Sequence, residues 1–367
     1  MATNIIDSGR TRMKLLEPFK VKNTEFQNRV AIAPMHPFGV PSGEGDSIGD
    51  EILEYYRRRL ETRPGLLITQ AMRVKERDNV LGGVGIITDT QAKGVKRLVD
   101  LAHEYGTKVL VQINFPSNGH HRHDTIDFWR KDELKEIEDA FVEGAIKAKA
   151  AGADGIEIHG ANLFFLNLFS SPITNHRIDE FGGDVHGRLR LATNIIKRIR
   201  EANGDDFLID YRMGWNRDLE TDIETAKALE EAGIDLFHIS YGIRESDRYM
   251  PYYYPSFVSF PGTTREKQIG PKDFEYNDVV YTGAQIKKNI NVPVILVDEI
   301  WSLERGEKLL QEDAGDFIAY GRPFLADEKF LEKGRENPGF DGCYKCKDCA
   351  WFYDFHDCPK AKQRGYA

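Results

Sequence analysis

The sequence predicts an α/β fold of the parallel (β/α)8 (TIM) barrel class, as a single domain with a short Cys-rich C-terminal tail. Short apolar runs bounded by Gly, Asp or Pro alternate with segments whose apolar residues recur every 3.6 residues. This alternation occurs eight times, which favours a closed parallel barrel over an open, doubly wound sheet. A chain of 367 residues, 41% of them hydrophobic, can form such a barrel as one domain. A Rossmann domain is not expected, because no G-x-G-x-x-G follows a predicted strand.

The predicted strands are short runs of β-branched or apolar residues. They span residues 29–34, 65–70, 107–114, 154–159, 206–213, 235–241, 292–297 and 316–321. Helices are expected near 48–62, 90–105, 131–151, 185–202, 220–232 and 277–290, and after each of the last two strands. The polar lead-in, 1–28, has no strong periodicity, and we assign residues 1–340 to the barrel and 341–367 to the tail.

The connections between these elements carry two further signals. AGAD at 151–154, AGID at 232–235 and AGD at 314–316 each place a glycine where a helix ends and a strand begins. The segments 115–130 and 242–276 are too long for simple connectors, so we expect lids or binding surfaces there. The first contains His120, His121 and His123, for which a solvated or substrate-facing loop is favoured over a metal site.

The composition is that of an ordinary soluble protein. The net charge of -9 argues against nucleic acid or an anionic membrane as a partner. No apolar run approaches the roughly 20 residues that span a bilayer, and the N-terminus has no apolar core of a signal peptide. We therefore expect a cytoplasmic protein that acts on a small-molecule substrate. The sequence is also compatible with an oligomer.

Polar side chains gather where the predicted strands end. In a parallel barrel these positions share one mouth, where active sites lie. The residues at these strand ends, polar and apolar together, are Pro34, Met35, His36, Gln70, Ala71, Gln112, Asn114, His159, Asn162, Arg212, His238, Tyr241, Asp298, Glu299, Gly321 and Arg322. Such a mouth suits a planar heteroaromatic ligand that offers both donors and acceptors. Gly321 and Arg322 follow the eighth strand, where barrels commonly bind phosphate.

Two members of this set also have a purely structural interpretation. Gln112 would satisfy backbone groups inside the barrel, and Arg212 would pair with Asp210 or Glu157. The chemistry is expected in the stretch 157–183, where His159 and Asn162 leave the fourth strand and enter a long loop.

These motifs lead to a family. The chain resembles the Old Yellow Enzyme family of FMN-dependent oxidoreductases over nearly its whole length. The matching segments are NRVAIAPM at 28–35, Gln112 at its strand end, EIHGAN at 157–162, SPITNHRIDEFGG at 171–183, R-L-R at 188–190 and AYGRPFLAD at 319–327. The fourth-strand motif with its N-x-R-x-D-x-[YF]-G-G continuation is the longest and most specific of them.

The resemblance implies a (β/α)8 barrel with FMN at its mouth. The backbone of Pro34 and Met35, together with Ala71, would contact the isoalloxazine. Gln112 would bond its pyrimidine edge, and Arg212 would lie by the N1–C2 carbonyl.

The same resemblance implies the remaining contacts. Gly321 and Arg322 would hold the phosphate. His159 and Asn162 would bond the carbonyl or nitro oxygen of an electron-poor substrate, which stabilises charge that develops there during reduction.

Four positions depart from the family pattern. Phe164 replaces the tyrosine that usually donates a proton, so water, Tyr241 or a tyrosine of residues 250–254 would have to do so. His36 stands where Thr or Cys is usual, and would donate to the flavin edge or act as an acid. Asp298 replaces a phosphate-cradling glycine, and NFPSNGH at 114–120 replaces a Gly- and His-rich stretch. These departures indicate a divergent member with an unusual substrate or weak ene-reductase activity.

All four cysteines fall in the tail, which favours a metal site over disulfides in a reduced compartment. They are Cys343, Cys346, Cys349 and Cys358. The tight C-x2-C-x2-C triplet with a distant Cys-Pro favours [4Fe–4S], with zinc and then free or disulfide-linked thiols as alternatives. The tail is similar to that of barrel flavoproteins like 2,4-dienoyl-CoA reductase and trimethylamine dehydrogenase, whose spacing differs slightly and which continue into a second nucleotide-binding domain.

The sequence thus indicates an FMN-dependent reductase, fed by NADH or NADPH, that acts on an activated alkene or a related carbonyl or nitro compound. Two alternatives remain open. One is a dehydrogenase or demethylase that passes electrons through the tail to a partner protein. The other is a barrel that binds FMN without turnover.

Overall fold

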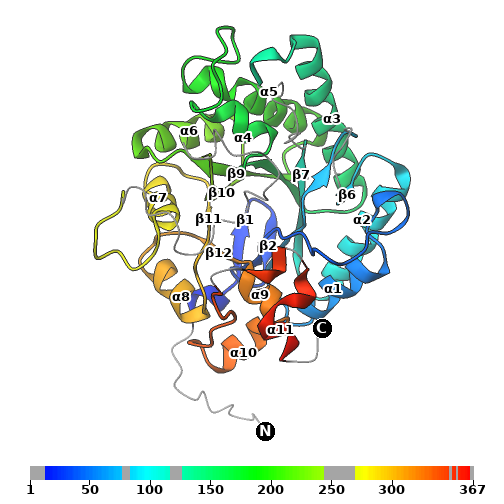
Figure 1. The fold of residues 1–367 in the computed structure, drawn as a ribbon, viewed down its shortest axis with the longest axis vertical. Coiled ribbons are helices and arrows are strands. Elements are labelled where there is room, and N and C mark those ends of the chain that lie inside the picture. Colours follow the sequence, from blue (N-terminus) through cyan, green and yellow to red (C-terminus); the bar gives the residue numbers. More distant parts are fainter. Residues whose placement is uncertain are drawn as a thin grey trace.

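The computed structural model describes residues 13–76, 83–115, 126–243, 269–346, 349–352 and 354–363. Eight parallel strands close into a barrel in the order β4-β3-β12-β11-β10-β9-β8-β7, and β4 pairs with β7 to complete the circle (Figure 1). The barrel strands are β3 (Val30–Ile32), β4 (Leu66–Ile68), β7 (Lys108–Asn114), β8 (Gly155–Gly160), β9 (Leu208–Trp215), β10 (Leu236–Tyr241), β11 (Val294–Val297) and β12 (Phe317–Tyr320). The predicted (β/α)8 class is confirmed, and each barrel strand lies within, or within two residues of, its predicted span.

Helices surround the barrel in the predicted order. The longer ones are α1 (Asp50–Leu60), α2 (Asp89–Glu104), α3 (Lys131–Ala150), α5 (Val185–Asn203), α6 (Leu219–Ala232), α7 (Asp278–Lys287), α8 (Leu303–Gln311) and α10 (Phe330–Glu336). The shorter elements are α4 (Phe165–Ser170), α9 (Arg322–Ala326), α11 (Pro359–Lys362) and the 3-10 helices η1 (Lys14–Leu16), η2 (Glu44–Asp46), η3 (Ile126–Phe128), η5 (Ala350–Phe352) and η6 (Phe355–Asp357). Side-chain caps set several helix starts, because their oxygens accept from otherwise unbonded backbone N–H groups. They are Thr88, Asp184, Asp218, Asn277 and Ser302.

A hairpin that the sequence did not predict closes one end of the barrel. β1 (Phe19–Val21) and β2 (Thr24–Phe26) lie within the segment that we expected to be a polar lead-in. Three-residue strands are too short to show a period. The rings of Phe19 and Phe26 lie 5.3 and 5.0 Å from that of Phe317 on β12, and so extend the apolar filling of the barrel.

Two of the three predicted helix-ending glycines adopt the left-handed backbone. Gly152 has φ +91° and Gly233 has φ +106°, which side chains with a Cβ resist. The third expectation is wrong in detail: Gly315 is not left-handed, and Asp313, with φ +55°, makes the turn after α8 instead. Asp tolerates this conformation better than most residues.

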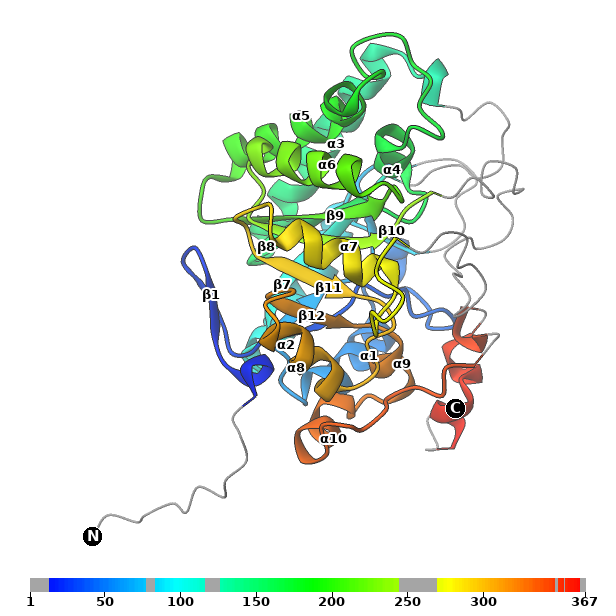
Figure 2. The ribbon, with the colours of Figure 1, turned by 90° about the vertical axis from the view of Figure 1, so that its left-hand side faces the viewer.

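The two ends of the barrel are covered by different parts of the chain. The β1–β2 hairpin lies at one end and the red C-terminal segment with α11 at the other (Figure 2). Two short strands, β5 (Met72–Arg73) and β6 (Val84–Gly85), extend the sheet next to the carboxyl end of β7. The tail therefore lies at the end where the barrel strands terminate.

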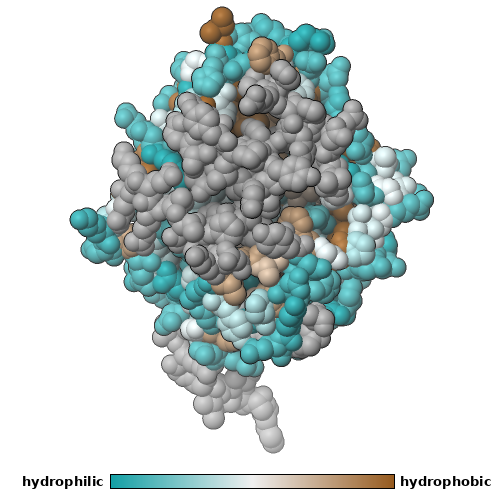
Figure 3. All heavy atoms as spheres, in the orientation of Figure 1, coloured by the Kyte–Doolittle hydropathy of each residue, from teal (hydrophilic) through white to brown (hydrophobic). Residues whose placement is uncertain are grey.

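The described surface fits the charge balance of the sequence. Where described residues face the viewer in Figure 3, most are hydrophilic, and apolar groups are few and separate. No helix in the described part of the chain is both long and apolar enough to cross a membrane. His120, His121, His123 and the tyrosines at 252–254 lie outside the described residues, as do 116–125 and 244–268 of the two long connections.

Candidate active site

A cavity of about 740 Å³ lies at the mouth of the barrel and is open to solvent. Its wall comes from the ends of β3, β9, β10, β11 and β12 and from the turn after β8, so the fold brings distant predicted residues together. The lining residues are Ala33, Met35, Asn162, Arg212, Ser240, Tyr241, Val297, Asp298, Glu299, Ile300, Trp301, Ala319, Gly321, Arg322 and Pro323. Its position, at the carboxyl ends of the barrel strands, is that of a ligand site.

Arg322 and Asp298 form the charged side of this cavity. Arg322 Nη2 lies 3.3 Å from Asp298 Oδ1, and the guanidinium stacks 4.5 Å from the centre of the Trp301 ring. The other Asp298 oxygen accepts from Asn277 Nδ2. The unexpected carboxylate is therefore held between an amide and a guanidinium.

The backbone at this point is strained. Asp298 has φ +91° and the following Glu299 has φ +53°. Successive left-handed residues other than glycine cost about 1–3 kcal/mol each and concentrate at functional sites. The conformation also gives a physical reason for the glycine that the family pattern has here.

A second strained turn presents Asn162. Asn162 and Leu163 have φ +54° and +63°. The Asn162 N–H donates to the Tyr241 carbonyl at 2.8 Å, and its Oδ1 lies 3.4 Å from Ser240 Oγ. With the oxygen occupied by Ser240, the side-chain NH₂ of Asn162 is left for the cavity.

Arg212 is the buried cation of the site. Its Nη2 donates to Ser240 Oγ at 2.9 Å, while its Nε is buried without an acceptor among the described residues. An unsatisfied guanidinium N–H beneath a cavity is costly unless a ligand accepts from it. The hydrogen bond that Arg212 makes goes to a hydroxyl, whereas Glu157 and Asp210, its two predicted partners, act on it through their charge.

His159 and Phe164 lie just below the strained turn. Their rings are 4.3 Å apart, and the Ala161 N–H donates to His159 Nδ1 at 3.3 Å. Burial, and next the charge of Arg212, holds the pKa of His159 well below its ordinary value. A neutral imidazole that accepts at Nδ1 carries its proton on Nε2, where it is a hydrogen-bond donor.

Gln112 lies deeper than expected, inside the barrel. Its Nε2 donates to Glu157 Oε1, and Glu157 Oε2 lies 2.6 Å from His238 Nδ1. The structural interpretation in which Gln112 satisfies only backbone groups is therefore wrong.

Three other predicted residues do not line this cavity. Pro34 is buried, whereas Ala71 and His36 are half-buried, and none of the three is on the cavity wall. Burial lowers the pKa of His36, and a contact with the Gln70 amide partly opposes this. His36 is therefore a neutral group near pH 7.

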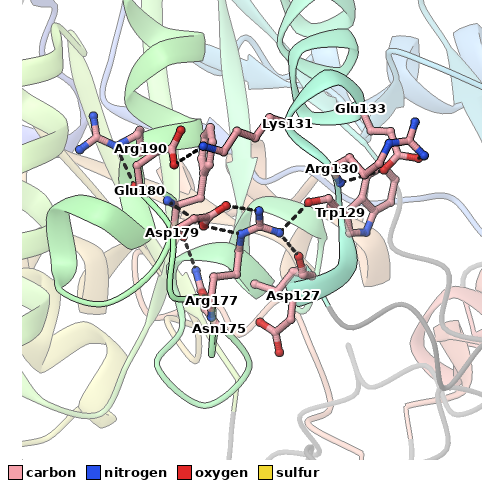
Figure 4. A network of polar contacts seen from close by, with 12 residues as sticks. Asp127, Trp129, Arg130, Lys131, Glu133, Asn175, Arg177, Asp179, Glu180 and Arg190 are labelled. Atoms are coloured by element: carbon pink, nitrogen blue, oxygen red, sulfur yellow. Dashed lines mark hydrogen bonds and ion pairs between the residues drawn. The ribbon is translucent and has the colours of Figure 1, made fainter.

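The loop that carries the longest motif is tied down by Arg177 (Figure 4). Arg177 binds both oxygens of Asp179, at 2.9 and 2.6 Å. Its Nη1 donates to the carbonyls of Ile126 and Trp129 at 2.6 and 2.8 Å. The motif N-x-R-x-D thus fastens the connection between β8 and α5 to the η3 turn and the residues that follow it.

The four tail cysteines line a second pocket of about 360 Å³. Arg322 lies on its wall as well as on that of the first cavity. Burial raises the pKa of Cys343, and that of Cys349 to about 11. The fold thereby gathers all four thiols, half-buried, next to the barrel mouth.

The spacing of these thiols bears on what they would hold. With Zn–S bonds of about 2.3 Å, the sulfurs of a tetrahedral zinc site lie roughly 3.8 Å apart. Among the described residues, only Glu157, Asp210 and His238 form a group of three or more potential ligands within 4.8 Å of one another. Three or more of the described cysteine sulfurs do not come within 4.8 Å of one another in the structure, which contains no ion.

Sequence reasoning missed several residues of the site. Ser240 orients both Arg212 and Asn162, and Asn277 binds Asp298. Asp210 was considered only as a partner for Arg212, although the alternation of side chains along β9 places both inside the barrel. That alternation was the signal available for Asp210, whereas a serine and a helix-capping asparagine carry no comparable signal.

The family comparison covers most of the chain. Residues 14–127 and 116–338 match the model described as "NADH:flavin oxidoreductase / NADH oxidase family". A curated relative, an NADH oxidase of Thermoanaerobacter brockii, is 32% identical over 350 residues, which cover 86% of this chain and 50% of that protein.

Two solved structures are similar to this fold. A 2-naphthoyl-CoA reductase in complex with 2-naphthoyl-CoA has a TM-score of 0.76 and 25% identity, and the match covers 94% of this chain and 56% of that chain. An Old Yellow Enzyme homologue of Zymomonas mobilis has a TM-score of 0.71 and 22% identity, with 94% and 99% covered. The chain spans about half the length of this NADH oxidase and of several other curated relatives, which are reductases.

Proposed function

The chain belongs to the NADH:flavin oxidoreductase / NADH oxidase family, which confirms the resemblance to Old Yellow Enzyme, and from this membership we propose an activity. The proposed activity is that of an FMN-dependent oxidoreductase, which takes reducing equivalents from NADH or NADPH. Its substrate is an electron-poor alkene, carbonyl or nitro compound. The activity of the whole protein is part of the proposal, because the chain spans about half of the NADH oxidase it matches.

One observation carries the proposal. The mouth cavity is lined by two guanidinium groups, that of Arg212 on β9 and that of Arg322 at the start of α9. The Arg212 Nε is buried and lacks an acceptor among the described residues. A flavin mononucleotide has a carbonyl-rich ring and a phosphate at its opposite end, so these two cations suit the two ends of one ligand.

When bound, FMN would supply the hydride chemistry that no protein side chain can perform. Gly321 and Arg322 would hold its phosphate. The backbone of Pro34 and Met35, with Ala71, would contact the ring. Arg212 would face the ring carbonyl, and we keep Gln112 as a pyrimidine-edge ligand, now oriented from below by Glu157.

We propose that His159 and Asn162 bind the substrate oxygen. His159 offers a neutral Nε2–H donor, since its Nδ1 already accepts from Ala161. Asn162 offers its NH₂, since Ser240 occupies its oxygen. Two preorganised donors stabilise the negative charge that develops on that oxygen as a hydride reaches the substrate.

The proton for the substrate must come from a group other than Phe164, whose phenyl ring carries none. Tyr241 lies on the cavity wall, and we propose it as the proton donor, with water as the alternative. His36 would act at the flavin edge as a neutral hydrogen-bond donor rather than as an acid near pH 7.

For the tail we propose a [4Fe–4S] cluster held by Cys343, Cys346, Cys349 and Cys358. The tight C-x2-C-x2-C triplet followed by a distant Cys-Pro supports a cluster over zinc, and the fold lines one pocket with all four thiols. Arg322 lines both pockets, so the cluster would lie beside the phosphate end of the flavin. A cluster there would relay single electrons to or from a partner protein, which keeps the dehydrogenase or demethylase alternative open.

Absorption spectroscopy of the anaerobically purified and reconstituted protein tests this function. We expect the two visible bands of an oxidised flavin, and a broad additional absorbance that dithionite bleaches if the cluster is present. Turnover of 2-cyclohexenone with NADH and with NADPH then distinguishes a reductase from a barrel that only binds flavin. A protein that retains no flavin after incubation with FMN would overturn the proposal.

A further inference from the structure

A layer of ionisable side chains lies inside the barrel, below the mouth cavity. Four neighbouring strands each contribute one polar residue: Gln112 from β7, Glu157 from β8, Asp210 from β9 and His238 from β10. Their exposed fractions are 1%, 0%, 0% and 0%. The interior of such barrels is normally packed with branched apolar side chains, and buried charges cost several kcal/mol unless they are compensated. This layer therefore needs a specific explanation.

Glu157 is the centre of the layer. One of its oxygens accepts from Gln112 Nε2, and the other lies 2.6 Å from His238 Nδ1. Asp210 is close to both, because the ligand atoms of Asp210, Glu157 and His238 all lie within 4.8 Å of one another. No described side chain donates an N–H to either oxygen of Asp210.

Three close ligand atoms raise the question of a metal ion, and the distances argue against one. Two ligands of a four-coordinate ion with bonds of about 2.0–2.1 Å lie roughly 3.3 Å apart. Glu157 Oε2 and His238 Nδ1 are 2.6 Å apart, a distance that fits one shared proton. The cluster is also closed to solvent, since each of its three members is fully buried.

The charges of the layer balance if Asp210 is neutral. The cation that faces it is Arg212, two residues along β9, and one carboxylate is enough to compensate it. Two ionised carboxylates this close in a buried site would repel each other strongly. Burial, and next the negative charge of Glu157, holds the pKa of Asp210 well above its ordinary value. Burial alone would raise the pKa of Glu157, but the hydrogen bond from His238 and the charge of Arg212 oppose it, and the net shift is downward.

The remaining groups that face the layer are consistent with this balance. His159 on β8 is neutral, and burial also lowers the pKa of His238, against the opposing effect of Glu157. Asp298, after β11, adds a more distant negative charge that acts on Arg212. His238 therefore donates its Nδ1–H to Glu157 as a neutral imidazole.

We propose that Glu157, Asp210 and His238 form a proton-sharing cluster with one negative charge, in which a protonated Asp210 and the His238 Nδ1–H both donate to the Glu157 carboxylate. Glu157 is a positioning residue. It holds the Gln112 amide with its NH₂ directed down into the barrel, and it compensates Arg212 from the side opposite the cavity. The effect on a bound flavin rests on the function proposed above, whereas the protonation of Asp210 does not.

Infrared difference spectroscopy of the flavin-free protein tests the protonation directly. A protonated carboxyl gives a C=O stretching band that a carboxylate lacks. We expect this band at pH 9 in the wild-type protein and its loss in Asp210→Asn. Asp222 is the matched control, because burial raises its pKa to about 7: its band should be present at pH 5, absent at pH 9 and removed by Asp222→Asn. A wild-type protein without the band at pH 9, or a band that Asp210→Asn leaves intact, would overturn the proposal.

The donor roles are tested by two replacements of similar size. An asparagine at 210 is neutral and keeps an N–H that can donate to Glu157, whereas Asp210→Leu removes the donor. Thermal unfolding should therefore show a clearly larger loss for Asp210→Leu than for Asp210→Asn, and ¹⁵N NMR should show His238 protonated on Nδ1. Equal losses for both variants, or a His238 protonated on Nε2 alone, would contradict the assignment.

The link to the flavin has a separate readout. In Glu157→Gln the charge that compensates Arg212 is lost, so the midpoint potential of bound FMN should rise, while in Asp210→Asn it should stay close to wild type. A rise in both variants would show that Asp210 carries a charge. If the wild-type protein binds no FMN, the proposed function fails, and the infrared result still decides the protonation of Asp210.

Discussion

Replacing Asp298 is expected to strengthen FMN binding about tenfold. If Arg322 holds the FMN phosphate as proposed, Asp298 competes with that phosphate, since its Oδ1 lies 3.3 Å from Arg322 Nη2. At this separation two unit charges attract by about 1.3 kcal/mol in a fully aqueous dielectric. The two side chains are only 15% and 17% exposed, so we take roughly 1–2 kcal/mol as the competing interaction. Each 1.4 kcal/mol corresponds to a factor of ten in affinity.

Two variants separate the charge from the backbone strain. Asp298→Asn removes the charge but keeps a side chain at φ +91°. Asp298→Gly removes the charge and also relieves strain of about 1–3 kcal/mol, partly offset by the lost contact with Asn277. Both variants should bind FMN about equally tightly, and only the glycine variant is expected to lose little or no thermal stability.

Flavin fluorescence quenching in titrations of the apoprotein measures this effect. Riboflavin, which lacks the phosphate, is the control ligand, and its affinity should be unchanged in both variants. Added salt should reduce the gain, because the wall of the cavity is open to solvent. An FMN affinity that is unchanged or weaker in Asp298→Asn would refute the view that this carboxylate competes for Arg322.

Three further predictions follow from the site and its surroundings. Phe164→Tyr should raise the rate of alkene reduction by about 10²-fold if protonation limits the reaction, whereas the control Phe164→Leu should not raise it. Equal steady-state rates in wild type and Phe164→Tyr would indicate another proton source. Asp222 is buried with a pKa raised to about 7, so its protonated form favours the folded state: the stability it contributes is complete below about pH 4 and is lost as the pH rises through 7. Since each pKa unit corresponds to about 1.4 kcal/mol, Asp222→Asn should be more stable than wild type at pH 8 by up to ~4 kcal/mol in urea unfolding, and a gain that is the same at pH 4 would argue against this. Cys349→Ser should lose the iron found in the reconstituted protein by metal analysis yet keep the flavin bands, and an unchanged iron content would exclude this thiol as a ligand.

The sequence was most informative where local patterns carry the information. The strands and main helices followed from apolar runs and 3.6-residue periodicity, because the burial of one face imposes these periods on the chain. The mouth residues followed from one topological rule, that the carboxyl ends of parallel strands meet. The β1–β2 hairpin and the left-handed Asp313 were not predicted, because three-residue strands and single turns show no periodic pattern in the sequence.

By itself, then, the sequence determined the barrel, its strand order along the chain, the family and the set of residues at the strand ends. Only the tertiary structure decided which of those residues line the cavity and which lie below it. It placed Arg212 and Asn162 on the cavity and joined them through Ser240, and it put Gln112 below the cavity on Glu157. It also brought Asp210, Glu157 and His238 together from three strands. Protonation depends on distance and burial in three dimensions, and neither quantity is written in the spacing of residues along a chain.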